Sequence, residues 1–136
     1  LFDETLAPLR KFRNVKIERR FLTHGEIAAI HKDYGICLTP TRMDAQGVSR
    51  DEAMASGLVP ISNAVAAIPE FMDESCGILA DSEDAEGLAA GIEAVYKSPS
   101  RFAALSAAAA ARVRRQSAKH VVVWQELALF TEGIHA

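Results

Sequence analysis

The chain has 136 residues, of which 49% are hydrophobic and 24% charged, and a formal net charge of −3. These values indicate an ordinary soluble globular chain of about one domain, and they exclude an overall basic surface for nucleic acid. The longest alanine-rich run, residues 103–111, is too short to span a bilayer, and no signal peptide is recognisable. We therefore expect a cytoplasmic protein without a nucleic-acid partner.

The first predicted elements are the end of a helix at residues 6–12 and a strand at residues 15–18. Thr23 and Glu26 then have the spacing of a capping box, which predicts a helix through about Lys32. These elements begin an alternation of short apolar strands and amphipathic helices. Such an alternation is typical of a parallel sheet covered by helices on both faces.

The middle of the chain continues this alternation. Residues 35–40 form a short apolar run closed by proline, which predicts a buried strand that ends at the edge of the sheet. A helix is expected from about Ser49, with Gly57 as its C-terminal stop. Another strand is expected at residues 58–61, followed by a loop with a short helix near Pro69.

The last third is predicted to be mainly helical. A short strand at residues 77–80 precedes a helix at residues 83–97, which Pro99 ends, and residues 101–130 are expected to be helical throughout. Two apolar stripes with helical spacing are interpreted as core contacts. They are Phe102, Leu105, Ala109 and Val113 on one side, and Val123, Leu127 and Phe130 on the other. A packing role in the core is also expected for Trp124.

The cysteines and histidines do not indicate a metal centre. Cys37 and Cys76 lack metal-ligand spacing and a disulfide-rich context, so both are expected to be buried free thiols. No two of the four histidines have the helical spacing of a zinc site. We therefore expect no cofactor and no metal bound by side chains alone.

The residues of greatest chemical interest lie between the strand at 35–40 and the next helix. Asp44 and Glu52 place two carboxylates eight residues apart across this junction. The first N–H groups of a helix have no internal partner and, with the helix dipole, attract a phosphate, while Gly47 allows close approach. An anion site is one interpretation. The other is that Ser49 and Glu52 form a capping box and that Asp44 is only a turn former.

The sequence around this junction resembles a known signature. Residues 44–61 are similar to the Glu-x7-Glu and Glu-Ala-Met-Ala-x-Gly-x-Pro-Val motifs of the retaining glycosyltransferases of group 1, also called family 4. Ile68-Pro69-Glu70 resembles the Pro-Glu element of that family, and Gly77-Ile78-Leu79 resembles its Gly-x-Leu-Val strand. These matches occur in the order and at the distances found in the family.

The resemblance implies an α/β, Rossmann-like part of the C-terminal, donor-binding domain of a GT-B glycosyltransferase. Residues 1–100 would be the donor-binding domain without its first strand-helix units, and residues 101–136 would be C-terminal helices that pack on it. In the family, the missing units carry an Arg and a Lys that neutralise the donor pyrophosphate. The chain is therefore expected to be a piece of a longer enzyme, inactive by itself, with acceptor contacts mainly in the missing N-terminal domain.

The resemblance also implies roles for the residues of the junction. Asp44 would be the catalytic residue and would meet hydroxyls of the donor sugar. The rest of the donor would be bound by Gln46, Gly47, Val48, Ser49 and Glu52, with backbone N–H groups at the phosphates and Glu52 at the ribose. A carboxylate accepts two hydrogen bonds from a vicinal diol, and a helix start stabilises charge on a leaving diphosphate. The resemblance thus favours a binding role for Glu52 over pure capping.

Two features depart from the family motif. Asp44 stands where the family has Glu, one methylene longer, and Ala45-Gln46-Gly47 replaces Gly-Phe-Gly. Because Asp44 keeps the charge, we expect an altered donor preference and not a loss of function. Gln46 is able to add a hydrogen bond to the sugar that phenylalanine cannot make.

The resemblance therefore implies a retaining transferase that moves a hexosyl group from a UDP-, GDP- or ADP-sugar to a glycan, lipid or other acceptor, as in polysaccharide biosynthesis. Peripheral membrane association of the parent protein and self-association of this fragment through its truncated sheet edge are further expectations. The alternative hypothesis is a non-catalytic Rossmann-like binding or interaction module, as a degenerate donor domain would be.

Overall fold

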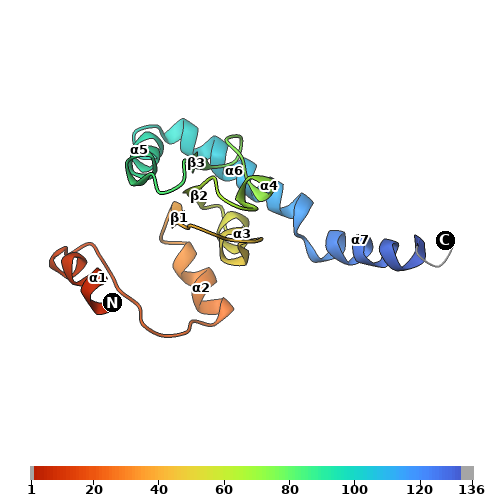
Figure 1. Ribbon diagram of the computed structural model, residues 1–136, viewed down its shortest axis with the longest axis horizontal. Helices are drawn as coiled ribbons and strands as arrows, with labels where there is room; N and C mark the ends of the chain where they lie inside the picture. The colour runs from red at the N-terminus through yellow and green to blue at the C-terminus, as the bar shows by residue number, and fades with distance from the viewer. Residues whose placement is uncertain (1, 133–136) are drawn as a thin grey trace.

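The computed structural model describes the backbone of residues 2–132 (Figure 1). Leu1 and residues 133–136 lie outside the described residues. The latter include His135 and are the last residues of the segment predicted at 101–136. The chain forms a three-stranded parallel sheet flanked by helices, with strand order β1-β2-β3. The predicted α/β class is confirmed.

Most of the elements expected from the sequence are present. In chain order they are α1 (Phe2–Leu6), the 3-10 helix η1 (Ala7–Lys11), α2 (His24–His31), β1 (Ile36–Thr39), α3 (Val48–Ala55), β2 (Val59–Asn63), α4 (Ile68–Phe71), β3 (Ile78–Ala80), α5 (Ala85–Tyr96), α6 (Pro99–Gln116) and α7 (Lys119–Glu132). The helix end expected at 6–12 corresponds to α1 and η1, and the short helix near Pro69 is α4.

Two predicted elements are wrong. Residues 15–18 have no regular structure, because within residues 2–132 the sheet consists of β1, β2 and β3 alone and offers this segment no neighbour. Exposed ion pairs such as Lys16–Glu18, at 3.0 Å, accompany the segment instead. The continuous helix expected over 101–130 is also interrupted. Ser117 leaves helical geometry, with φ −120° and ψ 3°, and separates α6 from α7.

The core is built around β2, which is buried over its whole length. Val59 and Ile61 are two positions apart in this strand, so their side chains point to the same face of the sheet. There Val59 packs with Val95, and Ile61 packs with Leu88, both from α5. Because β1 and β3 both run parallel to β2, the carboxyl ends of all three strands lie along one edge of the sheet.

The two C-terminal helices differ in how they pack. The first apolar stripe is confirmed, since Leu105 and Ala109 of α6 are buried and their stripe neighbours pack against the core. The predicted core role of the second stripe is wrong. The exposed fractions are 41% for Val123, 47% for Leu127, 73% for Phe130 and 70% for Trp124. After the break at Ser117, α7 extends away from the sheet and its main contact is with α6 (Figure 1).

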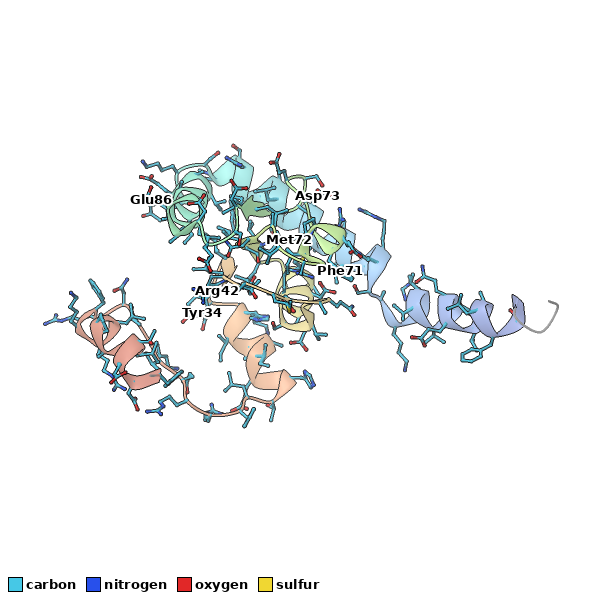
Figure 2. The ribbon with its side chains drawn as sticks, in the orientation of Figure 1. Tyr34, Arg42, Phe71, Met72, Asp73 and Glu86 are labelled. Atoms are coloured by element: carbon cyan, nitrogen blue, oxygen red, sulfur yellow. The ribbon has the colours of Figure 1, made fainter. Side chains whose placement is uncertain are left out.

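Both cysteines are free thiols, as expected, but only one is fully buried. Cys76 packs with Ile68 and Met72, and Met72 is labelled in Figure 2. Cys37 is only half-buried, and this burial raises the pKa of its thiol. Among the described helices, none is both long and apolar enough to cross a membrane.

Tight packing around Gly77 yields a stability prediction. A Cβ at this position would lie 2.6 Å from Met72 Cε and 2.7 Å from the carbonyl oxygen of Pro60. Overpacking of this kind costs about 1–3 kcal/mol, so Gly77→Ala is expected to lower the free energy of unfolding by that amount in urea. In α2, Gly25 is the control, because nothing lies within 4 Å of its Cβ position. Gly25→Ala is expected to be neutral or to stabilise by up to about 1 kcal/mol. Equal losses from both substitutions would contradict this packing.

The capping box of α2 is formed and yields a pH prediction. The backbone N–H and the hydroxyl of Thr23 donate to Glu26 Oε2 at 2.8 and 2.9 Å. The Thr23 backbone bond, followed by bonds from the Arg20 and Thr23 side chains, lowers the pKa of Glu26 from 4.5 to about 2. The contribution to stability is therefore complete above about pH 4.5 and is lost as the pH falls toward 2. An NMR titration of the Glu26 carboxyl is expected to show this low midpoint, and Arg20→Gln to raise it. A midpoint at the ordinary value for glutamate would contradict the capping geometry.

Candidate site at the start of α3

The predicted site residues lie on the loop after β1 and on the first two turns of α3. Gly47 is the N-cap of this helix, with φ 70° and ψ 61°, a left-handed conformation that glycine adopts at the least cost. No side chain caps the helix end. The carboxyl edge of a parallel sheet is where α/β proteins bind ligands. An uncapped helix start therefore lies at the edge where a ligand is expected.

Two backbone N–H groups at this helix start are available to a ligand. The first bonds of α3 run from the N–H groups of Arg50 and Asp51 to the carbonyl oxygen of Gly47, at 3.0 and 3.1 Å. The N–H groups of Val48 and Ser49 precede them and so have no partner within the helix. Both residues are exposed. These groups and the helix dipole favour an anion at this position.

Glu52 contacts another helix and does not cap its own. Because Gly47 is the N-cap, the alternative capping box between Ser49 and Glu52 is not formed. Glu52 Oε1 lies 3.1 Å from Nδ1 of His24, at the start of α2, and the Glu52 side chain is 33% exposed. A second contact joins the same two helices, between His31 Nδ1 and Ser56 Oγ at 3.0 Å. The orientation of Glu52 is therefore set partly by α2.

His24 contacts a candidate site residue, and no sequence pattern indicated this contact. It stands 28 positions before Glu52, beyond the reach of any local spacing rule. The one available signal was that His24 and His31 are seven residues apart, which places them on the same helix face. Within the described residues no group of three or more His, Cys, Asp and Glu side chains is arranged to hold a metal ion.

Asp44 lies in front of α3 and is half-buried. Its carbonyl oxygen accepts a hydrogen bond from the N–H of Ala67 at 3.4 Å, which ties this loop to the loop after β2. Its Oδ2 lies 3.0 Å from the point where a Cβ of Gly47 would stand. Some surface is exposed on each of the predicted site residues Asp44, Gln46, Gly47, Val48, Ser49 and Glu52. A ligand is therefore able to reach this segment from solvent.

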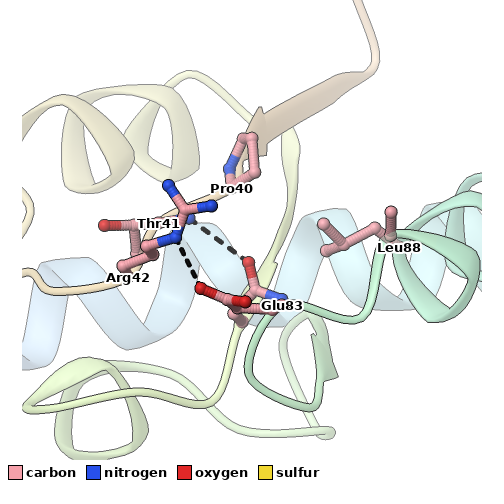
Figure 3. A pocket seen from close by; sticks show the side chains of 7 residues that line it. Pro40, Thr41, Arg42, Glu83 and Leu88 are labelled. Carbon is pink, nitrogen blue, oxygen red and sulfur yellow. Dashed lines mark hydrogen bonds and ion pairs between the residues drawn. The ribbon is translucent and has the colours of Figure 1, made fainter.

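A pocket of about 320 Å³ opens beside this segment (Figure 3). Its lining comes from the loops after β1 and β3, the last residue of β2, and α5: Pro40, Thr41, Arg42, Asn63, Glu83, Ala85 and Leu88. Arg42 Nε donates to Glu83 Oε1 at 2.6 Å, and Figure 3 shows these two side chains facing each other. No sequence pattern indicated this pocket, because the residues that line it come from segments far apart in the chain. It adjoins the predicted site residues without including them.

The buried amide of Asn63 joins the loops around this pocket. Its Oδ1 accepts from the backbone N–H of Thr41 at 3.2 Å, and its Nδ2 donates to the carbonyl oxygen of Asp81 at 2.6 Å. Only 3% of Asn63 is exposed. The loops after β1 and β3 are therefore held together by the last residue of β2.

Comparisons with known proteins show the family and the fold. The family model described as Glycosyl transferases group 1 matches residues 4–98. Sucrose-phosphate synthase from Thermosynechococcus elongatus superposes with a TM-score of 0.85 at 21% identity, over 98% of this chain and 34% of that chain. A variant of S. aureus TarM, in complex with fondaparinux, alpha-GlcNAc-glycerol and UDP, superposes with a TM-score of 0.77 at 16% identity. That match covers 93% of this chain and 26% of TarM. No curated protein matches the sequence.

Crowding at Gly47 yields a further stability prediction. In Gly47→Ala the new Cβ would occupy a left-handed residue, 2.9 Å from Arg50 Nη1 and 3.0 Å from Asp44 Oδ2. Gly57 is the matched control, since its φ is 88° but the nearest atom to its Cβ position is Ser106 Oγ at 3.4 Å. Left-handed strain alone costs about 1–2 kcal/mol, so we expect Gly57→Ala to lose about that much stability in urea and Gly47→Ala to lose more. A smaller loss for Gly47→Ala than for Gly57→Ala would be inconsistent with the crowded start of α3.

Proposed function

Because the chain belongs to the Glycosyl transferases group 1 family and has the fold of its GT-B members, we propose that it is the donor-binding part of a retaining glycosyltransferase. This enzyme would move a hexosyl group from a nucleotide sugar to an acceptor. The observation that carries the proposal is the uncapped start of α3 at the carboxyl edge of the sheet, with Asp44 before it and Glu52 on its second turn.

The diphosphate of the donor is proposed to bind at the start of α3. The N–H groups of Val48 and Ser49 would donate to its oxygens, and Gly47 leaves the backbone accessible. The helix dipole adds the equivalent of roughly half a positive charge at this position. The neighbour TarM was solved in complex with UDP, which supports a nucleoside diphosphate as the class of ligand.

Glu52 is proposed to bind the ribose hydroxyls. Its carboxylate is able to accept two hydrogen bonds from a vicinal diol. The contact with His24 at 3.1 Å orients this carboxylate from the side of α2. The side chain of His24 is itself 93% exposed, so its ring is open to contact with a bound nucleotide.

Asp44 is proposed to be the catalytic residue that meets hydroxyls of the donor sugar, with Gln46 as a second contact. The shorter carboxylate of Asp44 would bring the sugar closer to the loop than the Glu of the family motif does. Gln46 is exposed and has an amide that both donates and accepts. The proposal therefore includes a preference among donor sugars that differs from that of relatives with Glu and Phe at these positions.

The proposed chemistry uses the helix start as an electrostatic stabiliser. During transfer, the bond between the anomeric carbon and the phosphate oxygen breaks, and its electron pair leaves with the diphosphate. The oxygen of an acceptor hydroxyl bonds to the anomeric carbon on the same face of the sugar, and its proton passes to the departing phosphate oxygen. The anomeric configuration is thereby retained. The N–H groups at the start of α3 are preorganised and would stabilise the charge that develops on the diphosphate.

The acceptor is proposed to bind mainly outside this chain. The chain spans about a third of the length of the sucrose-phosphate synthase chain and about a quarter of TarM. The remainder of the parent protein would supply the acceptor contacts and any peripheral contact with a membrane. A glycan or lipid acceptor, polysaccharide biosynthesis and a cytoplasmic location complete the proposal.

An amide NMR titration tests this function. The chain is titrated with UDP, GDP and ADP and with their sugar conjugates, and we expect shifts centred on residues 47–52. Glu52→Ala is expected to weaken all binding about tenfold or more, because a charge-assisted hydrogen bond is lost. Asp44→Ala is expected to weaken only the sugar conjugates. Glu86→Ala is the control, since this exposed glutamate lies on α5, away from α3 (Figure 2).

Either of two results would contradict the proposal. One is the absence of nucleotide binding at millimolar concentration, both in the chain and in the intact protein that contains it. That result would favour the non-catalytic binding module. The other is binding that is equally strong in Glu52→Ala and Glu86→Ala, because the ribose site would then lie elsewhere.

A further inference from the structure

Arg50 is a buried cation whose hydrogen-bonding capacity is only partly used. It is the third residue of α3, and its exposed fraction is 1%. Its Nε and Nη1 have no hydrogen-bond partner among the described residues. Charged side chains are rarely buried unless they are paired, and unsatisfied buried donors often mark functional positions. Arg50 is therefore a candidate for a functional role.

The guanidinium is held beneath the loop that carries Asp44. Nη2 donates to the carbonyl oxygen of Gln46 in that loop and lies 3.4 Å from Asp51 Oδ1. The guanidinium carbon lies 5.6 Å from the ring centre of Phe71, which is labelled in Figure 2. Because Asp51 contacts Arg50 through one long bond, most of the guanidinium's donors remain available to other groups.

Gly47 brings the unpaired Nη1 and the Asp44 carboxylate to the same small space. The Cβ position of Gly47 lies 2.9 Å from Arg50 Nη1 and 3.0 Å from Asp44 Oδ2. Opposite charges in this position attract each other, and the attraction is stronger beside a buried group than in water.

We propose that Arg50 is a positioning residue that sets the direction of the Asp44 carboxylate toward the donor sugar. It does so through its charge beside Gly47 and through its bond to the Gln46 carbonyl, which fixes the same loop. Arg50 is too buried to contact the donor itself. This inference rests on the proposed function, because Arg50 acts through Asp44. It concerns recognition of the sugar and not of the diphosphate, which the backbone N–H groups bind.

Arg50→Met separates this role from a merely structural one. Methionine keeps an unbranched side chain beside Phe71 but removes the charge and the donors. We expect binding of the sugar nucleotide to weaken by about tenfold to a hundredfold, because the sugar hydroxyls lose a well-directed hydrogen bond to a charged acceptor. The Kd of the nucleoside diphosphate is expected to change little. A structural role would weaken both ligands by the same factor, and that result would overturn the inference.

A double-mutant cycle with Asp44→Ala adds a second readout. In the Asp44→Ala background, Arg50→Met is expected to have almost no further effect on sugar-nucleotide binding, because the group that Arg50 positions is gone. Additive losses would overturn the inference. Arg114→Met is the control, since Arg114 is exposed on α6 and is expected to change neither Kd.

The cycle is measured on the intact protein that contains this chain, with whichever of UDP, GDP or ADP binds most tightly and its sugar conjugate. Arg50→Lys is the second variant. If circular dichroism shows that Arg50→Met is unfolded, the double-mutant cycle is measured with Arg50→Lys in its place. Lysine keeps the charge but lacks the planar set of donors, so we expect an intermediate loss. If the unsubstituted protein binds no nucleotide, the proposed function itself fails. Nucleotide binding with additive losses would overturn only the role of Arg50.

Discussion

The parallel pairing of β2 with both of its neighbours is the constraint on which the site depends. This pairing brings the ends of three strands to one edge, and the edge carries both the start of α3 and the adjoining pocket. The amide of Asn63 reinforces it by joining the loops after β1 and β3. Separating these loops would break the hydrogen bonds of the buried Asn63 amide. An unsatisfied buried polar group costs about 1–3 kcal/mol, in addition to any hydrogen bonds lost between the strands. The loops are thereby held at fixed positions relative to the sheet.

At that edge, one backbone conformation has two consequences. The left-handed turn at Gly47 begins α3 without a side-chain cap, which leaves the first N–H groups open. The missing Cβ at the same residue leaves room for Arg50 Nη1 on one side and Asp44 Oδ2 on the other. A residue with a side chain at this position would crowd Arg50 Nη1 and Asp44 Oδ2. It would also strain the left-handed backbone at the start of α3. The proposed anion site and the placement of the Asp44 carboxylate are thus linked by a single glycine.

Local patterns predicted the elements well, whereas contacts between distant segments were not visible in the sequence. The Thr23–Glu26 capping box depends on a three-residue spacing and is formed. The strand expected at 15–18 is wrong because β propensity does not reveal whether a neighbouring strand exists. The core role expected of Trp124 is wrong for a similar reason, since helical periodicity shows which residues share a face but not what covers it. The burial of Arg50 and the contact of His24 with Glu52 also depend on tertiary packing. The motif therefore indicates a candidate site but not the residues that surround it.

Asp51 connects the site to the far end of α6. While its Oδ1 faces Arg50, its Oδ2 accepts a hydrogen bond of 2.8 Å from Ser117, the residue that ends α6. Asp51 is 7% exposed, so loss of the Ser117 hydroxyl would leave a buried carboxylate oxygen without its partner. Loss of the carboxylate would in turn remove the ion-pair partner of Arg50. The start of α3 and the end of α6 are therefore coupled through one hydrogen bond, although 66 residues separate the two positions.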